Sequence, residues 1–140
     1  MNYELVILEQ PGPEDREAIL APLVRYNQQK APAVRAEPLV ISVRGADGQA
    51  MGGLWGRTGY DWLFIELLVV PEALRGQKVG TTIMRQAEAI ARERGCIGAW
   101  LDTFEFQARG FYEKLGYRVF GEIGDYPRGS ARYFLQKRFD

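Results

Sequence analysis

The stretch from Trp62 to Gly95 constrains the fold most, because it joins an apolar strand, a polar turn and a long amphipathic helix. Trp62–Val70 is apolar except for Glu66, which is typical of a central strand covered on both faces. Pro71 ends this strand, because proline has no N–H group to donate to a sheet ladder. The pattern therefore predicts a strand–turn–helix unit.

The segment after the turn predicts a helix that ends at Gly95. Its apolar residues recur every three or four positions, as they do on one face of a helix. Cations in its last turn complement the helix dipole, and glycine suits the position after a helix end. The predicted apolar face contains Val79, Ile83, Met84, Ala87, Ile90 and Ala91, and the polar face contains Arg85, Gln86, Glu88, Arg92 and Glu93.

The turn from Arg75 to Gly80 places small residues and two cations at the start of that helix. The first N–H groups of a helix have no intrahelical acceptor, so the turn favours an anion, most simply a phosphate. It is not a P-loop, because Lys78 is not followed by Ser or Thr, and it has too few glycines for a dinucleotide fingerprint. Taken alone, it is equally compatible with an ordinary structural connection.

Two segments resemble the signatures of the GCN5-related N-acetyltransferase (GNAT) family. Val69–Gly80 (VVPEALRGQKVG) resembles the acyl-CoA pyrophosphate loop, Gln/Arg-x-x-Gly-x-Gly/Ala, and Phe111–Tyr117 (FYEKLGY) resembles the second signature, FYEKLGF. Their order and spacing match the family, and the resemblance covers Trp62 to the C-terminus. Lys78 stands where the family has glycine, and Gly110 where related sequences often have proline. A lysine with positive φ costs on the order of 1 kcal/mol, whereas in helical geometry that cost vanishes and the ammonium group adds a phosphate contact.

The sequence predicts one α/β domain over residues 1–140, a mixed sheet with helices on both faces. The resemblance implies a mostly antiparallel sheet of six or seven strands, in which two neighbouring parallel strands splay to form a cofactor cleft. A helix opens at Glu14, Pro22 kinks or splits it, and the Pro-punctuated stretch Tyr26–Pro38 is predicted as a loop. A second short helix is expected over Gln107–Leu115. The expected strands are Tyr3–Glu9, Leu39–Arg44, Ala50–Arg57, Trp62–Val70, Gly98–Thr103, Tyr117–Ile123 and Ala131–Phe139.

The resemblance also implies a binding site for acetyl-CoA. The backbone of Leu68, Val69 and Val70 would pair with the pantetheine arm, and an N–H group there would stabilise an oxyanion on the thioester. Gln107 stands where the family often has Asn, and it either contacts the cofactor arm or caps a helix. The implied pyrophosphate loop consists of Arg75, Gly76, Gln77, Lys78, Val79, Gly80 and Thr81.

Tyr112 matches the tyrosine that protonates the leaving CoA sulfur in many family members. A phenol with a pKa near 10 is a competent donor to a thiolate, although a packing role for this tyrosine is the alternative. Glu66 is a candidate general base, because burial would raise the pKa of its carboxyl toward the working range. Asp102 is the rival candidate, and a salt bridge is an equally good explanation for either carboxylate. Catalysis by positioning alone, without a dedicated base, also stays open.

Composition excludes several other classes of function. The chain has no histidine, which excludes Ser-His-Asp and Cys-His catalytic sites. It also excludes the usual zinc sites, and no metal is expected. Its single cysteine, Cys96, excludes an internal disulfide and is interpreted as a packing residue. A formal net charge of zero gives no reason to expect nucleic acid or a membrane surface as a partner. No signal peptide or membrane span is visible, so a cytoplasmic location is expected.

The function predicted from these patterns is acetyl transfer from acetyl-CoA to a primary amine of a small molecule, peptide or protein, by direct attack in a ternary complex. Asp125 is a weak candidate for attracting the amine, and the aromatic residues Trp55, Tyr60, Trp62 and Tyr126 are candidates for walls of its pocket. The alternative is a non-catalytic acyl-CoA-binding module, which the lysine in the phosphate loop keeps open. A homodimer is compatible with this fold.

Overall fold

The computed structural model describes residues 1–140 as two compact units, Met1–Val34 and Arg35–Asp140. The first unit contains one helix, α1 (Pro13–Lys30), which begins where the Asp15 carboxylate accepts a hydrogen bond from Gly12 N at 2.8 Å. Pro22 does not split this helix. The helix extends to Lys30, so the loop predicted from Tyr26 was wrong in its first part. The strand predicted over Tyr3–Glu9 was also wrong, because these residues form no regular structure.

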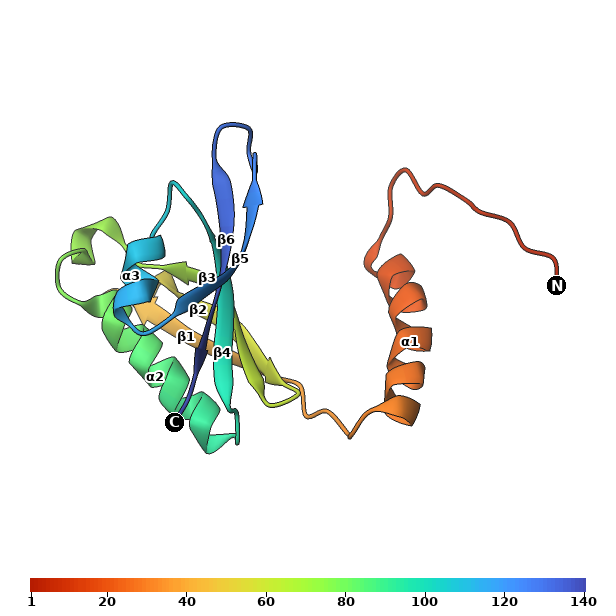
Figure 1. Ribbon diagram of the computed structural model, residues 1–140, viewed down its shortest axis with the longest axis horizontal. Coiled ribbons are helices and arrows are strands. Elements are labelled where there is room, and N and C mark those ends of the chain that lie inside the picture. Colours follow the sequence, from red (N-terminus) through yellow and green to blue (C-terminus); the bar gives the residue numbers. More distant parts are fainter. The chain divides into compact units, whose positions relative to one another are not determined.

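The second unit is built on a six-stranded sheet with the order β1-β2-β3-β4-β6-β5 (Figure 1). The neighbours β3 and β4 run parallel, and every other pair of neighbours is antiparallel. This arrangement confirms the predicted mixed, mostly antiparallel α/β fold. The strands are β1 (Glu37–Arg44), β2 (Ala50–Gly59), β3 (Trp62–Val69), β4 (Gly98–Phe104), β5 (Arg118–Gly124) and β6 (Ala131–Arg138).

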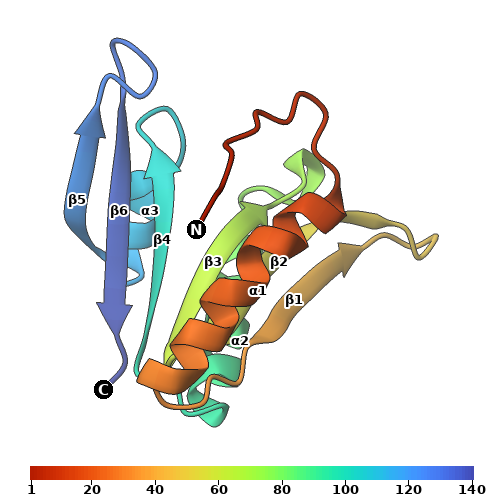
Figure 2. The same cartoon turned by 90° about the vertical axis from the view of Figure 1, so that its right-hand side faces the viewer.

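Helices α2 (Val79–Glu93) and α3 (Arg109–Lys114) cover one face of this sheet (Figures 1 and 2). A single 3-10 turn, η1 (Glu72–Leu74), links β3 to the loop before α2. No helix in the structure combines the length and the apolar character that a membrane span needs. The core between sheet and helices includes Leu39, Leu63, Met84, Ala87, Cys96, Leu101, Tyr117 and Leu135.

Glu88 does not lie on the polar face of α2, as its residue type had suggested. It is buried, with 6% of its surface exposed. Its position explains this, because it lies one turn after Met84 and one turn before Ala91, both of which are fully buried. The prediction for Glu88 was therefore wrong because it followed the polarity of the residue rather than its place on the helix.

Strands β3 and β4 stay together only along their first halves. Their pairing runs from Trp62–Gly98 to Ile65–Leu101 and then stops, although both strands continue. At this level Ile65 pairs with Gly56 on β2 while Leu67 pairs with Trp55, so Glu66 is an extra residue without a partner on β2. Such a bulge bends a strand and increases its twist. In Figure 2, β3 and β4 part toward their carboxyl ends, as the bulge would lead one to expect.

Candidate active site

The loop before α2 presents a continuous run of backbone N–H groups without acceptors. The turn η1 uses the N–H groups of Leu74 and Arg75, which donate to Pro71 O and Glu72 O. Helical hydrogen bonding resumes at Thr82, whose N–H donates to Lys78 O at 3.1 Å. Between them, the N–H groups of Gly76 through Thr81 donate no hydrogen bond within the chain. A helix start of this kind binds anions such as phosphate.

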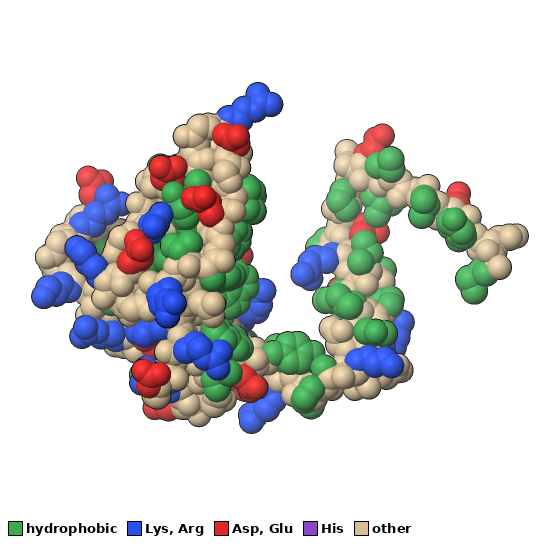
Figure 3. Space-filling model, viewed as in Figure 1, with side chains coloured by type: hydrophobic (Ala, Val, Ile, Leu, Met, Phe, Trp, Pro, Cys, Tyr) green, Lys and Arg blue, Asp and Glu red, His purple; other side chains and the backbone are tan.

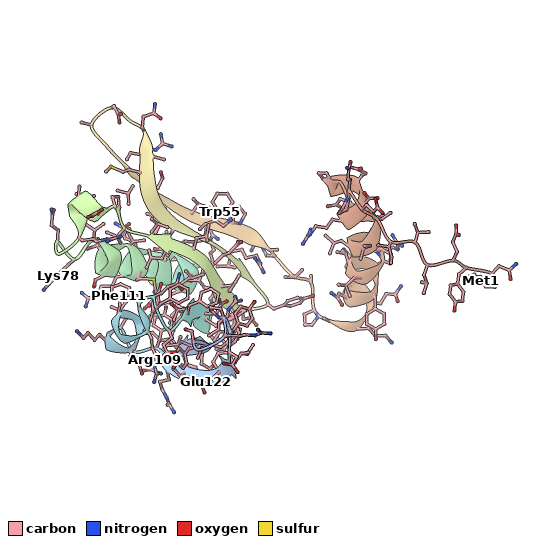
Figure 4. The ribbon with its side chains drawn as sticks, turned by 90° about the horizontal axis from the view of Figure 1, so that it is seen from above. Met1, Trp55, Lys78, Arg109, Phe111 and Glu122 are labelled. Carbon is pink, nitrogen blue, oxygen red and sulfur yellow. The ribbon has the colours of Figure 1, made fainter.

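Lys78 has the left-handed backbone conformation that favours glycine, with φ 60° and ψ 25°. Of the two geometries considered for this lysine, the one with positive φ is therefore observed. It reduces the stability of the fold by an amount on the order of 1 kcal/mol. Its side chain points away from the sheet at the outer end of the loop (Figure 4). Arg75 is exposed as well, and neither cation forms a salt bridge within the protein. Figure 3 shows Lys and Arg side chains gathered on this side of the molecule.

Gly80 lets α2 approach α3 closely. A Cβ atom at this position would lie 3.1 Å from Cζ of Phe111 and 3.3 Å from Cγ2 of Val70. Figure 4 shows Phe111 between the two helices. The glycine therefore serves packing, and it brings the start of α2 against the helix that carries Tyr112.

The remaining backbone of the predicted cofactor site lies on the part of β3 that has left β4. Leu68 and Val69 pair with Leu54 and Gly53 of β2, and no strand pairs with their other edge. Val70 follows directly after the end of β3. An unpaired strand edge offers N–H and C=O groups to an extended ligand.

Tyr112 is buried, but its hydroxyl group forms no hydrogen bond within the protein. Only 9% of the residue is exposed. No buried polar side-chain atom of the structure lacks a hydrogen-bond partner, so this hydroxyl must reach solvent. Burial, and secondly the negative charge of Asp102, raise the pKa of Tyr112 to about 12. The phenol therefore keeps its proton at neutral pH, as a general acid must.

The two candidate bases, Asp102 and Glu66, have different surroundings in the structure. Asp102 is paired with Arg132, which donates to its Oδ1 atom from both Nε (2.8 Å) and Nη2, so the salt bridge foreseen for this residue is present. Glu66 is exposed at the bulge and makes no salt bridge or hydrogen bond. The expectation that Glu66 is buried was wrong, because its side chain is exposed.

Gln107 closes the end of β4. Its Oε1 atom accepts hydrogen bonds from Phe104 N at 2.8 Å and from Thr103 Oγ1 at 3.1 Å. These bonds occupy the carbonyl oxygen and leave the amide NH₂ group without a partner in the chain. The helix-capping role expected for Gln107 is not observed, because its side chain binds the end of β4 instead, and contact with the cofactor arm stays a prediction.

The sequence analysis did not identify two groups of polar interactions near this site, one at Arg132 and one at Glu88. Arg132 also donates from Nη1 to Tyr126 Oη at 2.9 Å, which ties the β5–β6 loop to Asp102. Glu88 binds both Tyr117 and Lys137. For Glu88 a signal existed in its helical spacing, but nothing in the sequence pairs residues from different strands. No group of three or more His, Cys, Asp or Glu side chains is placed to hold a metal ion.

Comparison with known proteins identifies the family of this chain. A model described as the acetyltransferase (GNAT) family matches residues 3–117. The chain belongs to this family. GNAT proteins are acetyl-CoA-dependent acyltransferases, and the relatives of this chain are named accordingly, so the enzyme prediction is confirmed.

Three relatives illustrate the match. The chain is 38% identical to an acetyltransferase of Agrobacterium fabrum, over 99% of this chain and 100% of the relative. It is 40% identical to the blasticidin-S acetyltransferase of Streptomyces morookaense, over 78% of this chain and 83% of the relative. The crystal structure of an acetyltransferase from Bacillus cereus superposes with a TM-score of 0.83 and 31% identity, over 96% of this chain and 98% of that one.

Proposed function

We propose that this GNAT acetyltransferase transfers an acetyl group from acetyl-CoA to a primary amine by direct attack in a ternary complex. The observation that carries the proposal is the run of free N–H groups from Gly76 to Thr81 beside α3, the helix that bears Tyr112. An anion-binding site at the start of α2 and a proton donor on the neighbouring helix are what the pyrophosphate and the thioester sulfur of acetyl-CoA require. We also propose one domain over residues 1–140, since the family match spans both units.

The residues of the loop fit a pyrophosphate group. The proposed contacts are the N–H groups of Gly76–Thr81, including those of Gln77, Val79 and Gly80, and the side chains of Arg75 and Lys78. The open edge of β3 at Leu68, Val69 and Val70 is the proposed seat of the pantetheine arm, and Gln107 keeps a free amide group for the same ligand. Bound acetyl-CoA supplies an acetyl group that is activated as a thioester.

Two side chains divide the proton transfers. Glu66 accepts a proton as the amine nitrogen bonds to the acetyl carbon, either directly or through water. Tyr112 gives its phenolic proton to the sulfur as the carbon–sulfur bond breaks. An N–H group at the open edge of β3 stabilises negative charge on the acetyl oxygen. The exposed position of Glu66 and the salt bridge of Asp102 support Glu66 as the acceptor of the two.

We propose a small molecule as the amine substrate. The support is the relative from Streptomyces morookaense, whose name gives blasticidin S as its substrate and whose sequence matches most of this chain. Blasticidin S is therefore the first compound to test, followed by a panel of other small amines and N-terminal peptides.

The proposal is tested first by calorimetric titration with acetyl-CoA and with CoA. We expect both to bind at about micromolar concentration. Charge reversal at the loop, Arg75→Glu, should weaken both ligands at least tenfold, and the matched reversal Arg92→Glu on the last turn of α2 should not. Release of free thiol that depends on an added amine then identifies the acceptor. The absence of binding by either ligand contradicts the proposal.

A further inference from the structure

A buried carboxylate lies behind the candidate active site and has no part in the proton transfers described above. Both oxygens of Glu88 are engaged. Tyr117 donates its hydroxyl hydrogen to Oε2 at 2.9 Å, and Lys137 donates from Nζ to Oε1 at 2.8 Å. The cluster joins three segments, since Glu88 is on α2, Tyr117 precedes β5 and Lys137 is on β6.

Stability alone does not account for this cluster. Removing two charges from water costs about as much as their attraction returns, and well-packed apolar residues in place of a buried ion pair are often neutral or stabilising. The rest of this face of α2 is apolar, with Met84, Ala87 and Ala91 fully buried. Apolar groups in place of the Glu88 carboxylate, the Lys137 ammonium and the Tyr117 hydroxyl together would therefore be expected to pack as well, so the cluster is expected to serve another purpose.

The cluster is connected to Tyr112 through Tyr117. The N–H group of Tyr117 donates to Tyr112 O at 3.1 Å, and the edge of one ring meets the other, with centroids 6.2 Å apart and planes at 72°. Gly116 permits the turn between the two tyrosines, because its φ of 97° lies in the left-handed region that favours glycine. The end of α3 is therefore fixed by Tyr117, which is itself held by Glu88.

The segment from α3 to Tyr117 contacts α2 at two separate places. Phe111 packs on Gly80 at the start of α2, and Tyr117 binds Glu88 roughly two turns later, about 12 Å along the helix. A helix as short as α3, with 6 residues, is not stable by itself, so its orientation depends on such contacts. Arg109 also lies over the ring of Tyr133 on β6, at 4.4 Å, but only the contacts of Phe111 and Tyr117 orient α3 relative to the helix that presents the phosphate loop.

We propose that Glu88, acting through Tyr117, is a positioning residue that sets the Tyr112 hydroxyl group relative to the phosphate loop. This inference rests on the proposed role of Tyr112. The loop and the hydroxyl serve the pyrophosphate and the thioester of one ligand, so their separation must be fixed before the proton can reach the sulfur. A displacement near 1 Å can lower a rate about a hundredfold.

The first test is Tyr117→Phe, which removes one oxygen and keeps the ring and the ion pair of Glu88. We expect kcat to fall about tenfold, equivalent to about 1.4 kcal/mol of barrier. The dissociation constant of acetyl-CoA should stay within about twofold, because α2 and its loop are unchanged. Glu88→Gln should give a smaller fall in kcat, since an amide oxygen still accepts from Tyr117.

A double-mutant cycle with Tyr112→Phe distinguishes positioning from a general loss of structure. If Tyr117 acts through the Tyr112 hydroxyl, Tyr117→Phe should lower kcat in the wild type and have no further effect in the Tyr112→Phe background. The control is Thr58→Val, which removes another buried hydroxyl group, one that accepts from Arg94 Nη1 at 3.1 Å on β2. It should lower the denaturation midpoint without changing kcat.

Two results would overturn the inference. The first is an unchanged kcat in Tyr117→Phe. The second is an equal fall in both backgrounds, which would assign the effect to structure in general. Failure of the proposed function is separate, because then Tyr112→Phe itself would leave kcat unchanged.

Discussion

Lys78 combines a backbone penalty with a proposed ligand contact, and these two effects can be separated. It is one of four non-glycine residues with positive φ, at 60°, and the only one inside the phosphate loop. Its ammonium group has no partner within the protein. The residue is therefore expected to reduce the stability of the free protein while it strengthens phosphate binding.

Lys78→Gly should raise the free energy of unfolding by about 1 kcal/mol, because glycine adopts the left-handed conformation without a steric penalty. The same change should weaken CoA severalfold through the lost charge. Lys78→Ala is the matched variant, since it loses the charge and keeps the penalty. It should weaken CoA to a similar degree without the gain in stability. Urea denaturation and calorimetry measure the two effects, and equal stability of both variants would contradict the assignment.

At the scale of elements, the contact between α2 and α3 depends on the absence of a side chain at Gly80. The backbone there needs no special φ, so the reason for glycine is space. Gly80→Ala places its methyl group 3.1 Å from Phe111 Cζ, which is closer than ordinary van der Waals contact. The ring has to move, and α3 moves with it.

We expect Gly80→Ala to cost about 1 to 3 kcal/mol of stability, as overpacked sites do, and to lower kcat. Relief of the crowding in the double variant with Phe111→Leu should return part of the lost stability. Denaturation midpoints and initial rates of thiol release provide the measurements. A single variant as stable and active as the wild type would show that the two helices are not tightly coupled here.

Elements with a strong pattern of their own could be predicted from the sequence, and relations between elements could not. The apolar run after Trp62 and the helical spacing after Val79 specify β3 and α2 locally, and both are observed. The segment Tyr3–Glu9 has a strand composition but forms no strand, because a strand also needs a partner edge. The bulge at Glu66 was unpredictable for the same reason, since register is a property of two strands.

The same distinction applies to the candidate site. The loop residues Arg75–Thr81 and Tyr112 belong to short continuous motifs, so their resemblance to the family is enough to locate them in the sequence. The partners of Asp102 and Glu88 come from β6 and from the turn before β5, far along the chain. No local pattern marks such pairs, and only the fold brings them together.

At the scale of the whole molecule, buried tyrosines make stability depend on alkaline pH. Burial is the main cause that raises the pKa of Tyr112 from 10 to about 12, and burial together with the charge of Glu88 raises the pKa of Tyr117 further. A raised folded-state pKa means that the folded protein holds the proton more tightly than the unfolded chain. The contribution is therefore present in full below pH 10 and is lost as the pH rises through the folded-state pKa.

The free energy of unfolding should consequently fall between pH 10 and pH 12, by about 2 to 3 kcal/mol for Tyr112 alone at the upper limit. Tyr112→Phe removes this titrating group, so its stability should decline less steeply over the same range. Urea denaturation at a series of pH values from 8 to 11.5 measures both slopes. Equal slopes for wild type and variant would mean that the phenol is not shielded from water in the folded state.

The bulge on β3 also bears on how this strand tolerates insertions and deletions. In a bulge two residues of one strand oppose a single residue of the partner strand. Glu66 and Leu67 are accordingly both exposed, whereas Ile65 before them is buried and Leu68 after them packs against the core. Deleting Glu66 would therefore leave a regular alternation, in which Leu67, Leu68 and Val69 keep their partners on β2 and their sides of the sheet. The end of β3 can thus lose a residue at position 66 and give up only the bend, whereas losing Leu68 would reverse the side of Val69.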